Sequence, residues 1–265
     1  MATLLALYQN QFLVFVLILT RISGLVASSP VLGLKSAPMQ VRAFLAVALA
    51  IVVTPFHWQV TATMPANMPA LAILLVQELM LGLSLGLSIH VLFSGLHVTG
   101  QVMGQLSGMS LAEVFDPSQE ASVPVLADLM DRVTVAVFVI IGGHRQLMIV
   151  LLDTFKWMPP GKTAFGPTLV DALTEVTTQS LTLGVRASAP AIVALLMANL
   201  ILGLISRTLP QLNVMALGFG INILLVLLVM CGSLGAIAWL FQDSAWETIE
   251  TMREAFAGLV NGEAL

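Results

Sequence analysis

Four long apolar blocks constrain the fold of this chain more than any other feature: Phe12–Leu34, Leu71–Leu96, Val185–Ile205 and Val214–Phe241. A helix rises about 1.5 Å per residue, so about 20 apolar residues cross a hydrocarbon core of about 30 Å. Charged residues make up only 9% of the sequence, against about 25% in a soluble domain. We therefore predict an all-α, integral membrane-type protein. Residues 1–265 are expected to form a single domain, because no polar linker divides the chain.

Two other apolar blocks are poor membrane spans. Ala43–Phe56 is short for a crossing. Val133–Leu152 carries Gly142-Gly143-His144-Arg145 at its centre, where a charged side chain is costly against lipid. Non-helical backbone at membrane depth is tolerated only where protein or water covers it. This block is predicted to be a broken helix buried against partners, and the alternative is a plain helix with a snorkelling Arg145.

The charges give no orientation and no sign of a nucleic-acid partner. The net charge is −4 and the basic residues are scattered singly, so the electrostatic footprint of nucleic-acid binding is absent. If the six blocks crossed in turn, equal numbers of basic residues would fall on each side of the membrane. The positive-inside rule therefore does not predict an orientation. These segments resemble membrane helices in composition, but some are short or interrupted and their flanking charges show no bias. We therefore expect them to pack mainly against other proteins.

Arg21 lies near the middle of the first apolar block, where an ionisable residue needs a partner. Glu78, early in the block Leu71–Leu96, is the best candidate. Two roles remain open for this pair. The favoured one is an ion pair, within the chain or between subunits, that fixes helix packing. The other is a proton relay.

The apparent catalytic motifs lie in the wrong context. Gly82–Gly86 matches G-x-S-x-G and is followed by His90, but a nucleophile elbow needs a strand, a turn and a helix. Here the run is helical throughout, and small residues four apart favour helix packing. Gly218-Phe219-Gly220 has Ile223 where a dinucleotide-binding motif needs its third glycine. We expect no enzyme activity, no cofactor and no metal site.

Glycines at positions 100, 104 and 108 recur every four residues and would form one smooth helix face. Beyond Gly108 this pattern ends, and Asp116-Pro117 has the form of a new helix start. The segment between them carries Met109 and Phe115 on a loop of small residues. Such a loop suits a displaceable obstruction. The alternative is an ordinary connector whose apolar side chains pack against the domain.

A turn separates the last two apolar blocks. Pro210 disfavours helical geometry at Leu209, so the blocks are expected to form an antiparallel helical hairpin. Asn199 and Asn222 lie in the two arms, where amides can hydrogen-bond across helices.

Positions along the whole chain together resemble the FliR family of flagellar export-gate proteins, which is related to a subunit of virulence-type type III secretion systems. They are Arg21, Pro30, Pro38, Arg42, Pro55, Gln77-Glu78, Gly82, Gly86, Gly100, Gly108, Asp116-Pro117, Gly142-Gly143-His144 and Ser206–Asn213. One departure follows Gly218-Phe219, where the family usually continues with proline and often a basic residue. This chain has Gly220 and Asn222 instead.

The resemblance implies a subunit packed in a helical hetero-oligomeric export gate with FliP-like and FliQ-like subunits. It also implies contact with an FlhB-like switch subunit, passage of unfolded flagellar proteins, and a place in the flagellar basal body at the bacterial inner membrane. The candidate gate residues, part of a loop that would plug the channel, are Gly104, Gly108, Met109, Phe115, Asp116 and Pro117. The candidate partner-contact or structural residues are Arg21, Glu78, Gly100, His144, Arg207, Pro210, Gln211 and Asn213.

Two other classes of protein remain open. A small secondary transporter would use discontinuous helices near His144 to line a solute site. A purely structural membrane scaffold would tolerate changes in the loop after Gly108.

Overall fold

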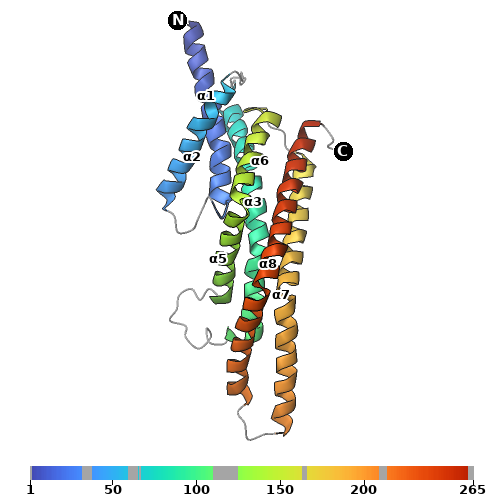
Figure 1. The fold of residues 1–265 in the computed structure, drawn as a ribbon. Coiled ribbons are helices and arrows are strands. Elements are labelled where there is room, and N and C mark those ends of the chain that lie inside the picture. Colours follow the sequence, from blue (N-terminus) through green and yellow to red (C-terminus); the bar gives the residue numbers. More distant parts are fainter. Residues whose placement is uncertain are drawn as a thin grey trace. The chain divides into compact units, whose positions relative to one another are not determined.

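The computed structural model describes residues 2–31, 38–58, 65, 67–109, 125–162, 166–208 and 214–261. Within these residues the fold is all-α, as predicted, and no strand occurs (Figure 1). The elements are α1 (Ala2–Ser28), α2 (Met39–Val53), the 3-10 helix η1 (Thr54–His57), α3 (Met68–Ser107), α5 (Val125–Ile140), α6 (Gly143–Trp157), α7 (Pro167–Thr208) and α8 (Val214–Asn261).

Two apolar blocks differ in their limits from the helices that form there, and the first still contains a helix long enough to cross a membrane, Gln9–Ser28. The block Phe12–Leu34 does not stay helical, because α1 ends at Ser28 just before Pro30. Proline lacks the N–H that a continuing helix needs, and it disfavours helical geometry at the residue before it. The prediction that the block Ala43–Phe56 is a poor span is wrong, because α2 and η1 together give 19 residues, Met39–His57, that are long and apolar enough.

Five helices of the described residues are long and apolar enough to cross a membrane. The pair α5 and α6 would add a sixth span if the two short helices were counted together. α3, α7 and α8 have 40, 42 and 48 residues, well beyond the roughly 20 that a crossing needs. The chain is a membrane protein of long and partly broken apolar helices.

The predicted break within Val133–Leu152 is confirmed. α5 ends at Ile140 and α6 begins at Gly143. Gly142 has a φ of 75°, in the left-handed region, which glycine adopts at no steric cost. The Gly142 carbonyl accepts hydrogen bonds from the backbone N–H groups of Arg145 and Gln146, so it starts the new helix.

The chain forms two compact units. The first comprises Met1–Val91, Gly142–Thr177 and Ala245–Leu265, and the second comprises Leu92–Ile141 and Thr178–Ser244. In the first unit α1 packs beside α2 (Figure 1), and its largest fully buried side chains include Leu17, Ile22 and Phe155. The prediction of one domain over residues 1–265 stays a prediction.

The core of the second unit contains three aromatic rings and a separate aliphatic cluster. Phe93, Phe138 and Phe241 meet edge-on or tilted, with centroids 5.3 to 6.4 Å apart. The aliphatic cluster comprises Met103, Leu126, Met130, Ala191, Leu195, Val226 and Met230. Because α3, α5, α7 and α8 all contribute to this cluster, hydrophobic burial holds the unit together.

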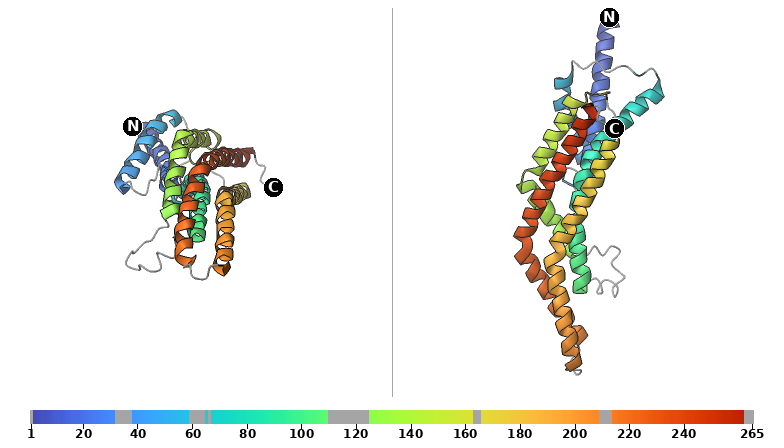
Figure 2. Two further views of the ribbon diagram at one scale, coloured as in Figure 1. Left: turned by 60° about the horizontal axis from the view of Figure 1, so that its bottom comes forward. Right: turned by 90° about the vertical axis from the view of Figure 1, so that its right-hand side faces the viewer.

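α7 and α8 form the predicted antiparallel hairpin in the second unit (Figure 2). Asn199 of α7 meets Asn222 of α8. Leu202 lies three residues further along α7, and Gly218 lies four residues earlier on α8. A Cβ added to Gly218 would be 3.2 Å from Leu202 Cδ1, so these two positions also face each other. The contacts advance in opposite directions along the two helices, which therefore run antiparallel. α7 ends at Thr208, just before the predicted turn, whose residues Leu209–Asn213 lie outside the described part of the chain.

Candidate functional site

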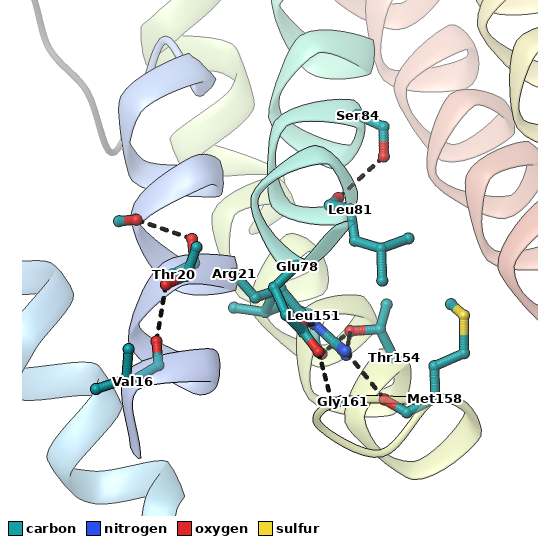
Figure 3. A network of polar contacts seen from close by, with 11 residues as sticks. Val16, Thr20, Arg21, Glu78, Leu81, Ser84, Leu151, Thr154, Met158 and Gly161 are labelled. Atoms are coloured by element: carbon teal, nitrogen blue, oxygen red, sulfur yellow. Dashed lines mark hydrogen bonds and ion pairs between the residues drawn. The ribbon is translucent and has the colours of Figure 1, made fainter. Parts of the chain in front are cut away.

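The first polar site is a buried ion pair in the first unit. Arg21 Nε donates to Glu78 Oε2 at 2.6 Å, and both side chains are 0% exposed. The predicted pairing of these two residues is thus confirmed as a contact between α1 and α3 within one chain (Figure 3). Burial of two charges is favourable only when their remaining polar atoms are also satisfied.

The rest of the Arg21 guanidinium is held by α6 and the residue that follows it. Nη1 donates to Thr154 Oγ1 at 3.2 Å and Nη2 donates to the Met158 carbonyl at 3.1 Å. The guanidinium carbon lies 4.4 Å from the centre of the Phe155 ring, a cation–π contact. Arg21 therefore joins α1 to α6 as well as to α3 (Figure 3).

The second oxygen of Glu78 is also used. Glu78 Oε1 accepts a hydrogen bond of 2.9 Å from the backbone N–H of Gly161, which lies in a turn and has a φ of 83°. Lys162 N–H donates to the Pro159 carbonyl across this turn. Each carboxylate oxygen has a donor and the pair is sealed from solvent, so the geometry supports a structural ion pair within the chain.

α1 and α3 pack closely enough to bring the Arg21 and Glu78 side chains into contact. A Cβ atom added to Gly24 would lie 2.6 Å from the carbonyl oxygen of Leu79, and one added to Gly82 would overlap the Arg21 backbone. Gly86 is equally crowded by Leu25 and Ser28. The predicted packing role of Gly82 and Gly86 is confirmed. The Ser84 hydroxyl, between them, is buried and donates to the Leu81 carbonyl of its own helix.

A second polar cluster links α3 and α5 in the second unit, and it was not predicted. His97 Nδ1 lies 3.0 Å from both carboxylate oxygens of Asp131, and Gln101 Nε2 lies 3.1 Å from His97 Nε2. One neutral tautomer satisfies both contacts, with Nδ1–H donating to Asp131 and Nε2 accepting from Gln101. His97 and Asp131 are 31% and 41% exposed. No pattern in the sequence selects Asp131 as the partner of His97.

An open groove of about 430 Å³ lies in the second unit, between the end of α3 and the hairpin. We call it the amide groove. It is lined by Gln105, Leu106, Ser107, Gly108, Asn199, Leu202, Gly203, Gly218, Phe219 and Asn222. Asn222 Nδ2 donates to Asn199 Oδ1 at 2.8 Å, so the predicted hydrogen bonding of amides across helices is confirmed. The departure at Asn222 therefore lies where two helices meet.

The predicted gate residues fall at the end of α3 and beyond it. Gly104 is buried, and Gly108 has a φ of 81° just after α3 ends at Ser107. A left-handed glycine is a common helix stop. Met109 packs partly buried against the aliphatic cluster, so at this residue the connector alternative fits. Phe115, Asp116 and Pro117 lie outside the described residues.

The remaining candidates are dispersed. Gly100 lies against α5, where an added Cβ would be 2.5 Å from Ala127 Cα, so close packing at this glycine is confirmed. His144 is half-buried, and its Nδ1 is buried without a hydrogen-bond partner among the described residues. Arg207 is exposed near the end of α7. Pro210, Gln211 and Asn213 lie outside the described residues.

In the described part of the chain no three His, Cys, Asp or Glu side chains come close enough to hold a metal ion. A second hollow of about 370 Å³ lies between α6 and α8 in the first unit and is lined in part by Gln146, Trp246 and Arg253. Arg253 also lies within 4.0 Å of Asp153 and Glu250. Neither the hollow nor the amide groove contains a nucleophile paired with a base.

Residues 12–248 match the model of a protein family described as bacterial export proteins, family 1. The chain is 30% identical to the flagellar biosynthetic protein FliR of Escherichia coli (strain K12) over 83% of this chain and 84% of that protein. It is 22% identical to FliR of Caulobacter vibrioides, over 91% and 96% of the two chains. It is 27% identical to the secretion system apparatus protein SsaT of Salmonella typhimurium, over 53% and 54%. The predicted resemblance to the FliR family is confirmed, and the chain belongs to the bacterial export proteins, family 1.

Proposed function

We propose that this protein is a core subunit of the flagellar type III protein export gate and forms part of the channel that passes unfolded flagellar proteins. Family membership supports an export role. The observation that carries the proposal further is the apolar surface of the α7–α8 hairpin. Large apolar side chains there are exposed along both helices, among them Val193, Leu196, Leu200, Leu204, Leu217, Ile221, Leu224 and Leu228.

These exposed apolar side chains must be shielded from water by another molecule. An exposed apolar patch that is long and continuous marks a surface for other proteins or for lipid. Helices about twice as long as a crossing requires present more apolar surface than one bilayer covers. The partners we propose are FliP-like and FliQ-like subunits packed against these helices, with an FlhB-like switch subunit in contact with the assembly. The location we propose is the flagellar basal body at the bacterial inner membrane, with part of the assembly above the bilayer plane.

We also propose that the segment after Gly108 plugs the channel. The support is local: α3 stops at a left-handed glycine, and the sequence that follows is small and polar with a few bulky apolar residues. Deletion of residues 108–114 in the assembled complex is expected to raise ion leak across the membrane. Unchanged conductance with the complex intact would rule out the plug.

A second candidate function is a small secondary transporter with a solute site near the helix break. The specific observation in its favour is His144, whose buried Nδ1 has no partner among the described residues and which follows the break at Gly142. In that case the protein would work alone, and energy coupling would reside in this chain rather than in partner proteins.

One experiment separates the two functions. The protein is tagged at its native locus, extracted in mild detergent and passed through gel filtration, and bound proteins are identified by mass spectrometry. The export-gate proposal expects one large particle with two other small hydrophobic proteins, and loss of motility when the gene is deleted. A lone monomer or homodimer in a normally swimming strain would instead favour the transporter.

A further inference from the structure

Asn222 lines the amide groove and has a side-chain oxygen without a donor among the described residues. The residue is 8% exposed. Its Nδ2 donates to Asn199 Oδ1, but its Oδ1 is buried and accepts no hydrogen bond from the described residues. An amide oxygen accepts up to two hydrogen bonds, and buried side-chain oxygens in folded proteins are rarely left without one. The described residues therefore leave one buried acceptor of the groove without a donor.

The groove also has space for another backbone. Gly203 lines it, and a Cβ added to Gly203 would meet no atom within 4 Å. The packing glycines of α3 differ in this respect, since a Cβ added to Gly82 would overlap the Arg21 backbone. A glycine that faces open space on an apolar helix allows a second helix to approach closely.

The surroundings of the groove decide what kind of molecule fits. Each of three exposed leucines, Leu200, Leu204 and Leu217, is next in sequence to a residue that lines the groove. An occupant that also covers them must be largely apolar. Lipid tails could cover the leucines, but they carry no donor for Asn222 Oδ1. A membrane helix with one Ser, Thr, Asn or Gln side chain could do both, because such side chains hydrogen-bond across helices.

We propose that the amide groove receives a membrane-spanning helix of a partner subunit, which packs on Gly203 and donates a hydrogen bond to Asn222 Oδ1. This inference rests on the proposed function, because it specifies one subunit contact of the export gate. The partner helix carries a small residue opposite Gly203 and a donor side chain about one turn away. The donor requirement gives specificity, since an apolar helix without a donor leaves the amide oxygen unsatisfied.

The contact is tested by photo-crosslinking in the whole complex. A photoreactive phenylalanine analogue replaces Phe219, which is half-buried and lines the groove. The complex is purified from the native operon and irradiated. The expected product joins this chain to one small hydrophobic partner subunit. A product with lipid, or one confined to this chain, would overturn the inference.

Substitutions then test separately the space beside Gly203 and the hydrogen bond to Asn222. Gly203→Leu fills the groove, and Gly235→Leu is the matched control because Gly235 also faces open space but does not line the groove. We expect Gly203→Leu to lose the partner, Gly203→Ala to lose part of it, and Gly235→Leu to retain it. Asn222→Leu is expected to weaken retention of the partner about tenfold, the effect of losing one buried hydrogen bond. Circular dichroism of each variant checks that it is folded.

The outcomes distinguish this inference from the proposed function. If the unmodified protein assembles, but Gly203→Leu and Asn222→Leu retain the partner as well as Gly235→Leu does, the inference is wrong and the export-gate proposal stands. If Gly203→Leu loses the partner but Asn222→Leu retains it, the proposed hydrogen bond to Asn222 is wrong. If the unmodified protein purifies alone, both proposals are wrong.

Discussion

The buried ion pair of the first unit and the amide groove of the second both place polar side chains among apolar helices, but they differ in completeness. Arg21 and Glu78 are fully buried, and each carboxylate oxygen has a donor from this chain. Asn222 is nearly as buried, yet its Oδ1 has no donor among the described residues. The hydrogen bonds of the first site are completed by residues of this chain. We propose that those of the second site are completed by a partner subunit.

The largest loss of stability is expected from removing one partner of the Arg21–Glu78 ion pair. Glu78→Ala leaves the Arg21 charge buried without its carboxylate and should lower the free energy of unfolding by about 3–5 kcal/mol. Thermal unfolding of the protein in detergent measures this loss. The double variant Arg21→Met/Glu78→Leu serves as a control, because an apolar pair of similar size should recover most of the stability. Glu78→Gln, if it left assembly intact but abolished proton-coupled export, would favour the relay role instead.

The next effect concerns the close approach of α1 and α3. Gly82→Val should destabilise the protein by about 1–3 kcal/mol, because the new side chain overlaps the Arg21 backbone and forces α1 away from α3. The control is Gly235→Val, which introduces the same β-branched residue into a helix where the added Cβ meets open space. Equal unfolding temperatures for the two variants would contradict the packing role of Gly82.

A smaller effect is expected from Asn222→Leu in the isolated chain. Only the hydrogen bond to Asn199 is lost there, so the free energy of unfolding should change by about 1 kcal/mol or less. The same variant should lose most of its partner in the complex, as proposed above. A large loss of stability in the isolated chain would instead make the groove a site of internal structure, like the Arg21–Glu78 pair.

The smallest effect is expected at the half-exposed link between α3 and α5. Asp131→Asn keeps the size of the side chain and replaces a charged acceptor of the His97 hydrogen bond by a neutral one. The free energy of unfolding should fall by about 1 kcal/mol or less, because the hydrogen bond can still form and both side chains are partly exposed. Thermal unfolding of the variant and the unmodified protein in detergent measures the difference. A loss as large as that of Glu78→Ala would show that this link is as critical as the buried pair.

Some features of this protein follow from the sequence alone because they depend on local chemistry. An all-α membrane fold follows from the length of the apolar blocks, and the break at Gly142 follows from two glycines close to the charged Arg145. The pairing of Arg21 with Glu78 follows from the cost of a lone buried charge, since few opposite charges are available inside the apolar blocks. The composition of each segment is enough for these inferences.

Other features were decided only when distant segments packed together. Thr154, Met158 and Gly161 complete the ion pair because α6 and its following turn lie against α1 and α3, and no spacing in the sequence selects them. Asp131 meets His97 for the same reason, and the groove exists only because the end of α3 reaches the hairpin. Local pattern determines which segments are helical and apolar, whereas tertiary packing determines which polar atoms find partners and which are left for another molecule.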